Sequence, residues 1–241
     1  MSRLVSILLI ILGSISGYGS ERATADFLGD EFAVLWEEPA ASYLAEKTAR
    51  YTYETEIVVD NGRKLGLVLY GTRSEYFCLI DKIEVYDGEK LIQSGLVEEA
   101  VMAEWGEGGS YYTESVREDG GISVADMNFD GAGDICLQGW VTNGANVPCY
   151  YWLWDKETEQ FSYAFCLCNA ETDKEHRQII CHMRDGANGY DTEYYAYDEK
   201  GKLQKIRYEY EDYHALIKKT YDLIGGEWKL TGEEALEPMK G

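Results

Sequence analysis

A stretch of twelve residues near the middle of the chain, Asp126 to Leu137 (DMNFDGAGDICL), carries oxygen-bearing side chains at alternate positions around a glycine. Counted from the first aspartate, side-chain oxygens fall at positions 1, 3, 5 and 9 and a backbone carbonyl at position 7, as in an EF-hand calcium loop. A loop wound around a calcium ion turns alternate side chains inwards, toward an ion that takes about six to eight oxygens. We therefore predict a calcium site with ligands from Asp126, Asn128, Asp130, Ala132 and Asp134.

Two features separate this segment from a true EF-hand. Position 12, where a bidentate Glu belongs, is Leu137, and the flanking segments GISVA and ICLQGW alternate like strands rather than helices. The sequence predicts a strand–calcium loop–strand unit, with Asp134, water or a distant residue completing the shell and an affinity of roughly 10⁻⁴–10⁻³ M. The alternative is a metal-free turn rich in Asp and Asn, in which Gly131 supplies a positive φ.

No recognised catalytic motif accompanies the loop. The three histidines, His176, His182 and His214, form no His-Glu-x-x-His signature, and the chain has no nucleophile elbow, Walker loop or dinucleotide fingerprint. The 44 acidic residues include enough carboxylates for a glycosidase pair, but nothing in the sequence singles one out. We therefore expect a protein that is not an enzyme.

The aromatic segment Tyr150, Tyr151, Trp152 and Trp154 allows a second kind of site. In a strand, Trp152 and Trp154 share one face while Tyr151 takes the other. On the surface these rings can stack on sugars or contact a partner's loop, and in the interior they anchor a sheet. The interior is favoured, because large aromatic residues in alternating strands usually pack inside.

The chain has six cysteines and no C-x-x-C pair, which leaves a zinc ribbon or thioredoxin-type site without support. If the segments CYYWLW and QFSYAFC pair antiparallel around the turn 156–159, Trp154 faces Phe161 and Cys149 faces Cys166. That spacing predicts a contact between two cysteines that can be oxidised to a disulfide.

The N-terminus and the net charge bear on where the protein acts. Residues 1–19 have the positive, apolar and small-residue regions of a signal peptide, and the apolar run Leu4 to Leu12 is shorter than the roughly 20 residues of a membrane span. The alternative is an uncleaved anchor. We expect a single β-rich domain over 20–241, secreted or in the cell envelope. A formal net charge of −22 argues against nucleic-acid binding and favours basic partners and cations.

Strand patterns dominate the rest of the chain, and helical spacing occurs only at 25–38 and 95–105. Five segments repeat a strand, an Asp, a turn and a large apolar residue that opens the next strand: Asp60–Leu65, Asp87–Leu91, Asp155–Phe161, Asp198–Leu203 and Asp222–Trp228. This repetition predicts an all-β fold of antiparallel hairpins in a propeller-like arrangement, with short N-terminal helical segments. The alternative is an irregular β-sandwich.

The calcium-loop segment, the hairpin CYYWLWDKETEQFSYAFCL and the segment AYDEKGKLQKI resemble a family of exported bacterial proteins. The hallmark of that family is an Asp-x-Asn-x-Asp-Gly-x-x-Asp calcium loop in a β-propeller-like fold, and similar loops occur in FG-GAP and VCBS-type repeats. The resemblance covers about Gly121 to Leu203. It implies metal-binding roles for the five loop residues named above.

The same resemblance implies a partner. At least one family member is an envelope immunity protein that inhibits a peptidoglycan hydrolase delivered by a type IV secretion system. Many relatives are lipoproteins, whereas this chain lacks their lipobox cysteine. We expect a non-enzymatic calcium-binding module that binds a protein, such as a basic peptidoglycan hydrolase. The alternative is a carbohydrate-binding or glycan-processing envelope protein that uses its Trp and Tyr residues.

Overall fold

The computed structural model describes residues 49–75, 77–106, 113–115, 117–139 and 145–238. Within these ranges the chain forms antiparallel sheets and one α-helix, α4 (Leu96–Trp105), which confirms the all-β class and the helix predicted at 95–105. The predicted signal peptide (1–19) and the helical segment predicted at 25–38 lie outside the described residues. None of the described helical segments is long and apolar enough to cross a membrane.

The first sheet has the order β1-β2-β3-β4, and β5 also pairs with β3. Its strands are β1 (Ala49–Val58), β2 (Lys64–Arg73), β3 (Cys78–Asp87), β4 (Lys90–Gln93) and β5 (Thr113–Ser115). In β2 every second side chain, from Leu65 through Leu67 to Leu69, is fully buried. This period of two is what a strand with one face toward the core requires.

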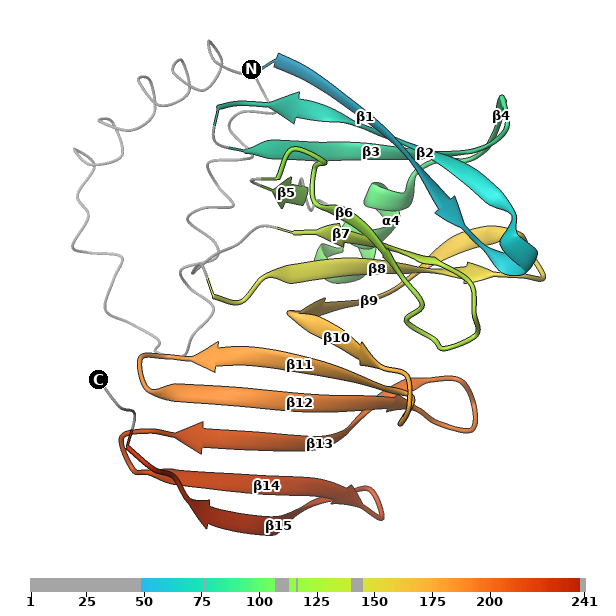
Figure 1. The fold of residues 1–241 in the computed structure, drawn as a ribbon. Helices are drawn as coiled ribbons and strands as arrows, with labels where there is room; N and C mark the ends of the chain where they lie inside the picture. The colour runs from blue at the N-terminus through green and yellow to red at the C-terminus, as the bar shows by residue number, and fades with distance from the viewer. Residues whose placement is uncertain (1–48, 76, 107–112, 116, 140–144, 239–241) are drawn as a thin grey trace.

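The second and third sheets follow along the chain (Figure 1). The second sheet contains β6 (Ile122–Ala125), β7 (Asp134–Gln138), β8 (Pro148–Asp155) and β9 (Gln160–Cys168) in sequence order. The third sheet, also in sequence order, contains β10 (Ala170–Asp173), β11 (Gln178–Asp185), β12 (Gly189–Tyr197), β13 (Leu203–Asp212), β14 (Ile217–Ile224) and β15 (Glu227–Ala235). Each connection between neighbours joins antiparallel strands, as the hairpin repetition predicts.

The main hydrophobic core lies between the first and second sheets, with α4 between them (Figure 1). Trp152 on β8 donates its indole N–H to the Leu96 carbonyl of α4 at 3.0 Å. Gln93 on β4 forms two hydrogen bonds with the backbone of Phe161 on β9, at 2.6 and 2.8 Å. A buried tryptophan and a side-chain amide therefore hold the two sheets together around one core.

A smaller core lies between the second sheet and the start of the third, and its buried residues are Met127, Cys136, Tyr151, Ile179 and Cys181. Both faces of the second sheet are thus covered. In the described ranges the three sheets follow one another as layers and do not close a ring, so the propeller-like arrangement is not confirmed. The packing of the first sheet on the second has the layered character of the β-sandwich alternative.

The predicted hairpins are present, but the position of one turn differs from the prediction. Asp222 does not open the last turn; it lies inside β14, paired with Lys229 and bound at 2.7 Å to Arg207. The turn falls three residues later, at Gly225 and Gly226, whose φ values are 65° and 84°. Two adjacent residues with positive φ form the tight hairpin turn that matches strand twist, and glycine adopts this conformation at the lowest cost.

Two glycines of β2 provide a matched test of this packing. A Cβ at Gly71 would lie 1.8 Å from the Leu79 carbonyl oxygen on β3, whereas at Gly66 it would make ordinary contacts with Tyr86, at 3.7 Å from its Cβ and 3.9 Å from its carbonyl oxygen. We expect Gly71→Ala to lower the free energy of unfolding by about 1–3 kcal/mol or more, because the backbone has to move. Gly66→Ala should change it by less than about 1 kcal/mol. Urea unfolding measures both, and equal effects would contradict the β2–β3 register.

Candidate metal centre

The loop between β6 and β7 is wound by its own acidic and amide side chains. The Asp126 carboxylate accepts the N–H groups of Asp130 and Gly131 at 3.0 and 3.1 Å. Asn128 Oδ1 accepts the Asp130 N–H at 3.1 Å, and Asp130 Oδ1 accepts the Ala132 N–H at 2.8 Å. Each predicted side-chain ligand in the first part of the loop therefore also shapes the loop, as short polar side chains do in Asx-type turns.

The backbone of the loop reverses at two residues with positive φ. Gly131 has φ 86°, as the alignment with an EF-hand loop predicts, and Phe129 has φ 60°, which the sequence did not indicate. Arg177 stabilises this reversal, because its Nη1 donates to the Phe129 carbonyl at 3.1 Å and its guanidinium lies 5.6 Å from the Phe129 ring centroid. Arg177 is in the turn before β11, so its contact with the loop depends on the tertiary fold.

The loop contacts all three sheets. The Gly133 N–H donates to the carbonyl of Val58, the last residue of β1, at 3.0 Å. A Cβ at Gly133 would lie 2.5 Å from that oxygen, so glycine is required for this approach. Ala132 is buried in the main core and Met127 in the smaller core. The segment 126–134 is thus the junction where the first, second and third sheets meet.

Asp134 has a different environment from the other acidic residues of the loop. Its side chain is 0% exposed, and its two oxygens accept the N–H groups of Met127 at 2.7 Å and Trp154 at 3.0 Å. Burial raises the pKa of Asp134 from its ordinary 3.8 to about 6, the two N–H groups oppose this rise, and the charges of Asp130 and Asp126 add to it. The buried carboxylate of Asp134 therefore connects the loop to β8 through these two hydrogen bonds.

Lys156, in the turn after β8, places a cation beside the loop. Its ammonium donates to the Asp130 carbonyl at 2.9 Å and lies 3.5 Å from Asp130 Oδ2. Sequence reasoning did not find this contact, because Lys156 belongs to a turn that reaches the loop only when β7 and β8 pair. A protein cation thus neutralises part of the negative charge that a bound metal ion would also neutralise.

The Tyr197 hydroxyl adds an unsatisfied polar group to this region. It is buried and has no hydrogen-bond partner among the residues that the structure describes. Burial raises the pKa of Tyr197, and the charges of Asp134, Asp126 and Asp130 raise it further. A buried hydroxyl without a partner is uncommon in folded proteins.

These observations allow a test of the predicted ligand set. The donors offered by Asp126, Asn128, Asp130 and the Ala132 carbonyl are oxygens, the type that calcium binds. In the described part of the chain, however, no three His, Cys, Asp or Glu side chains converge as a metal site. The oxygen donors of the loop are thus of the type that a hard cation binds, although its carboxylates do not converge on one point. A third carboxylate joins the set only if Asp134 shares its oxygens between the two N–H groups and the ion.

The other predicted sites have definite positions in the fold. Trp152, Trp154, Tyr150 and Tyr151 are all buried, which confirms their interpretation as core residues. The side chain of His176 lies 2.7 Å from Asp173 in a turn, and that of His182 lies 3.2 Å from Thr192. The aromatic segment is therefore not available to stack on a sugar.

The predicted contact between Cys149 and Cys166 is wrong. The pairing of Trp154 with Phe161 is present, but a β-bulge at Tyr151/Trp152 shifts the register by one residue, so Cys149 lies opposite Leu167. A shift of one residue moves a side chain to the other face of the sheet. All six cysteines lie in the described residues and are free thiols.

Comparisons with known proteins identify no family for this chain. No protein-family model matches it, and no curated protein matches it. A protein of unknown function from Bacteroides fragilis has 8% identity and a TM-score of 0.26, over 80% of this chain and 95% of that chain. A Bacteroides uniformis protein described as a "putative 6-phosphogluconolactonase" also has 8% identity and a TM-score of 0.26, over 76% and 82%. Likenesses this weak carry no argument about fold or activity.

The raised pKa of Asp134 predicts how stability depends on pH. The folded protein holds this proton more tightly than the unfolded chain, so the stabilisation is complete below pH 3.8 and is lost as the pH rises through about 6. The stability difference is defined as the free energy of unfolding of the wild type minus that of the variant, both measured without calcium. For Asp134→Asn this difference should fall by up to about 3 kcal/mol between pH 4 and pH 7. Urea unfolding in a chelator measures this difference.

Asp155→Asn is the control of opposite sign. The N–H groups of Glu157 and Thr158 lower the pKa of Asp155, so its stabilisation is present above the ordinary pKa and is lost as the pH falls. The free energy of unfolding of the wild type minus that of Asp155→Asn should therefore rise with pH. A difference for Asp134→Asn that stays constant from pH 4 to pH 7 would contradict the buried, ionisable state of Asp134.

Proposed function

We propose that the protein is a non-catalytic, calcium-binding β-sheet module that acts outside the cytoplasm by binding a partner. The observation that carries this proposal is the loop 126–134, in which the carboxylates of Asp126 and Asp130 are held on one short turn by loop N–H groups. Carboxylates this close repel one another unless a cation neutralises them. Lys156 supplies one such charge, and calcium would supply the rest.

In this proposal the ion would be held by side-chain oxygens of Asp126, Asn128, Asp130 and Asp134 and by the Ala132 carbonyl. Bound calcium supplies positive charge and cross-links the loop; it takes part in no reaction. Because the loop contacts Val58, Trp154 and Arg177, one from each sheet region, a stiffer loop would hold the three sheets in a constant relation. The function of the metal is therefore structural.

The surface proposed for the partner is an aromatic row on the third sheet, made of Tyr208, Tyr221 and Trp228. Tyr208 and Tyr221 stack with ring centroids 4.6 Å apart and an interplanar angle of 8°, and Trp228 packs edge-on against Tyr208 at 5.2 Å. Trp228 is 42% exposed and neighbouring Leu230 is 51% exposed. Exposed aromatic rings surrounded by polar residues are typical anchors of protein interfaces.

The charge of the molecule favours a basic partner. With 44 acidic and 22 basic residues, the surface attracts cationic proteins and accelerates their association. A basic peptidoglycan hydrolase of the lysozyme type, as the family resemblance implies, has this chemistry. A glycan is the second candidate, because an exposed ring such as that of Trp228 also suits the face of a sugar ring.

Calcium should stabilise the folded protein. At a hundredfold excess over the dissociation constant, binding adds about 2.7 kcal/mol, which raises the melting temperature by about 5–10 °C. Magnesium should raise it less, because it demands octahedral geometry with shorter bonds. Asp130→Ala should abolish the calcium-dependent rise, as measured by differential scanning calorimetry in excess calcium and in chelator.

Asp198→Ala is the matched control for this experiment. Asp198 Oδ1 accepts the N–H groups of Lys200 and Lys202 in the β12–β13 turn, so it shapes a turn in the same way but lies outside the loop 126–134. This variant should keep the full calcium effect. If the wild-type melting temperature is the same in calcium and in chelator, the loop is only a turn and the calcium part of the proposal fails.

Binding by the aromatic row is tested with a lysozyme-type hydrolase and cell-wall substrate. The protein should slow lysis, and Trp228→Ala should weaken this inhibition by about 5- to 30-fold, because truncation of an aromatic anchor costs about 1–2 kcal/mol. Leu91→Ala, which removes a 47% exposed side chain from the first sheet, should leave the inhibition unchanged. No inhibition, together with Trp228-dependent binding on a glycan array, would favour the glycan candidate instead.

A further inference from the structure

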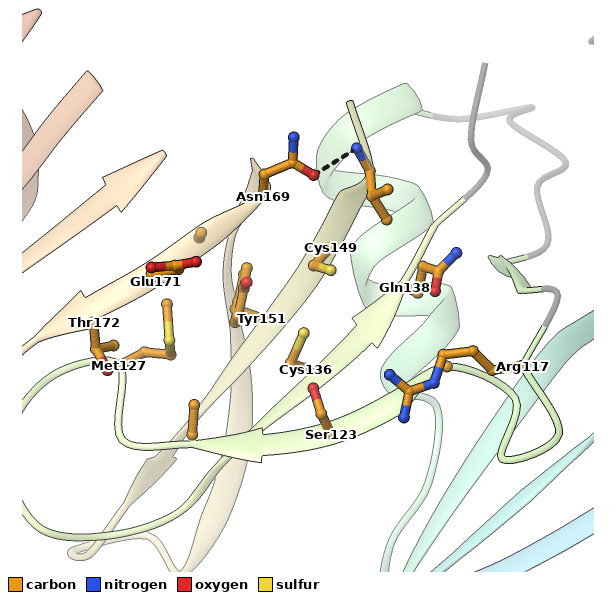
Figure 2. Close-up of a pocket in the computed structure, with 14 residues that line it drawn as sticks. Arg117, Ser123, Met127, Cys136, Gln138, Cys149, Tyr151, Asn169, Glu171 and Thr172 are labelled. Carbon is orange, nitrogen blue, oxygen red and sulfur yellow. Dashed lines mark hydrogen bonds between the residues drawn. The ribbon is translucent and has the colours of Figure 1, made fainter. Parts of the chain in front are cut away.

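Two cysteines from neighbouring strands face each other in a pocket of about 500 Å³ between the second sheet and β10 of the third (Figure 2). Cys136 lies on β7 directly opposite Tyr151 of β8, and Cys149 lies two residues before Tyr151. Because side chains alternate along a strand, Cys136, Tyr151 and Cys149 share one face. The regular β7–β8 register therefore places Cys149 beside the Cys136 thiol.

The two thiols are close neighbours in their free state. The Cys136 thiol interacts with the Cys149 thiol and with the Ser123 and Tyr151 hydroxyls. Two sulfurs placed side by side in this way can react one after the other with a single external disulfide.

We propose that Cys136 and Cys149 form a redox-active dithiol that is converted to a disulfide by exchange with an external disulfide of low molecular weight, of the glutathione type. The pocket gives such a molecule access, because both cysteines line it and Cys149 is the more exposed of the two. The pocket is bordered by Arg117 and Gln138 from the second-sheet side and by Glu171 on β10. These polar groups suit the amides and charges of a peptide-like disulfide.

The exchange has two steps. Cys149 reacts first because it is the more exposed of the two thiols: it loses its proton and its sulfur attacks one sulfur of the external disulfide, whose S–S bond breaks to release the first external thiolate. Cys136 then loses its proton and its sulfur attacks Cys149 Sγ, which breaks the mixed disulfide and releases the second external thiolate. The protein pair is oxidised by two electrons, the external disulfide is reduced by two electrons, and the two protons protonate the released thiolates.

The register of the strands indicates that the bond would be reversible. Diagonal neighbours in an antiparallel pair are about 7–8 Å apart, whereas the Cα atoms of a disulfide are about 4.4–6.8 Å apart. Because Cys136 and Cys149 are diagonal neighbours, the two strands have to approach each other as the bond forms. A bond that requires such movement is easily reduced again. It would link β7 to β8 close to the Asp134–Trp154 hydrogen bond.

The experiment uses the full chain, fully reduced and then exposed to excess oxidised glutathione. After denaturation and alkylation, the wild type should show alkylation of four of its six cysteines, with one disulfide that peptide mapping assigns to Cys136 and Cys149. Cys136→Ser removes the resolving thiol, so a glutathione adduct on Cys149 should accumulate. Dithiothreitol should restore six reactive thiols in the wild type within minutes.

Cys168→Ser is the matched control. Cys168 is half-buried, like Cys149, and burial raises its pKa, but it lies on β9 outside this pocket. This variant should form the Cys136–Cys149 disulfide to the same extent as the wild type. Six alkylated cysteines in the oxidised wild type, or a disulfide that joins any other pair, would overturn the proposal. The wild-type measurement does not depend on whether a variant folds, and it is independent of calcium.

Discussion

The buried carboxylate of Asp134 is the constraint on which much of the remaining structure depends. A carboxylate with no exposed surface is costly unless its oxygens are satisfied, and here they accept one N–H from within the loop and one from β8. The first bond positions Met127 in the smaller core, and the second aligns Trp154 for its packing on Phe161. A single polar side chain therefore sets the relation between the loop and the second sheet.

The loop that Asp134 closes has a second consequence, because its other residues reach the remaining sheets. Gly133 meets the end of β1 and Phe129 meets Arg177 before β11. The polar side chains that give the loop its calcium-like pattern also wind its backbone, so the same residues serve folding and any binding of a cation. The two interpretations of the sequence, a cation loop and an Asp-rich turn, thus describe the same backbone geometry. They differ only in whether a bound cation neutralises the carboxylates.

The third sheet differs from the other two in how its side chains are used. Its first strands complete the smaller core through Ile179 and Cys181, whereas its last strand, β15, is mostly exposed. Within the described residues, the aromatic rings of Tyr208, Tyr221 and Trp228 on β13 to β15 pack against one another. Trp228 and Leu230 keep apolar area in contact with water, and a partner of the proposed kind would cover this area.

The sequence by itself determined the class of fold, most of the hairpins, the helix at 96–105 and the winding of the loop. These features depend on alternation, turn residues and short-range hydrogen bonds, all of which act between neighbours in the chain. The tertiary structure alone decided the layering of the sheets, the contacts of Lys156 and Arg177 with the loop, and the cysteine neighbours. One bulge between Tyr151 and Trp152 changed the partner of Cys149, because side-chain facing has a period of two and a single extra residue reverses it.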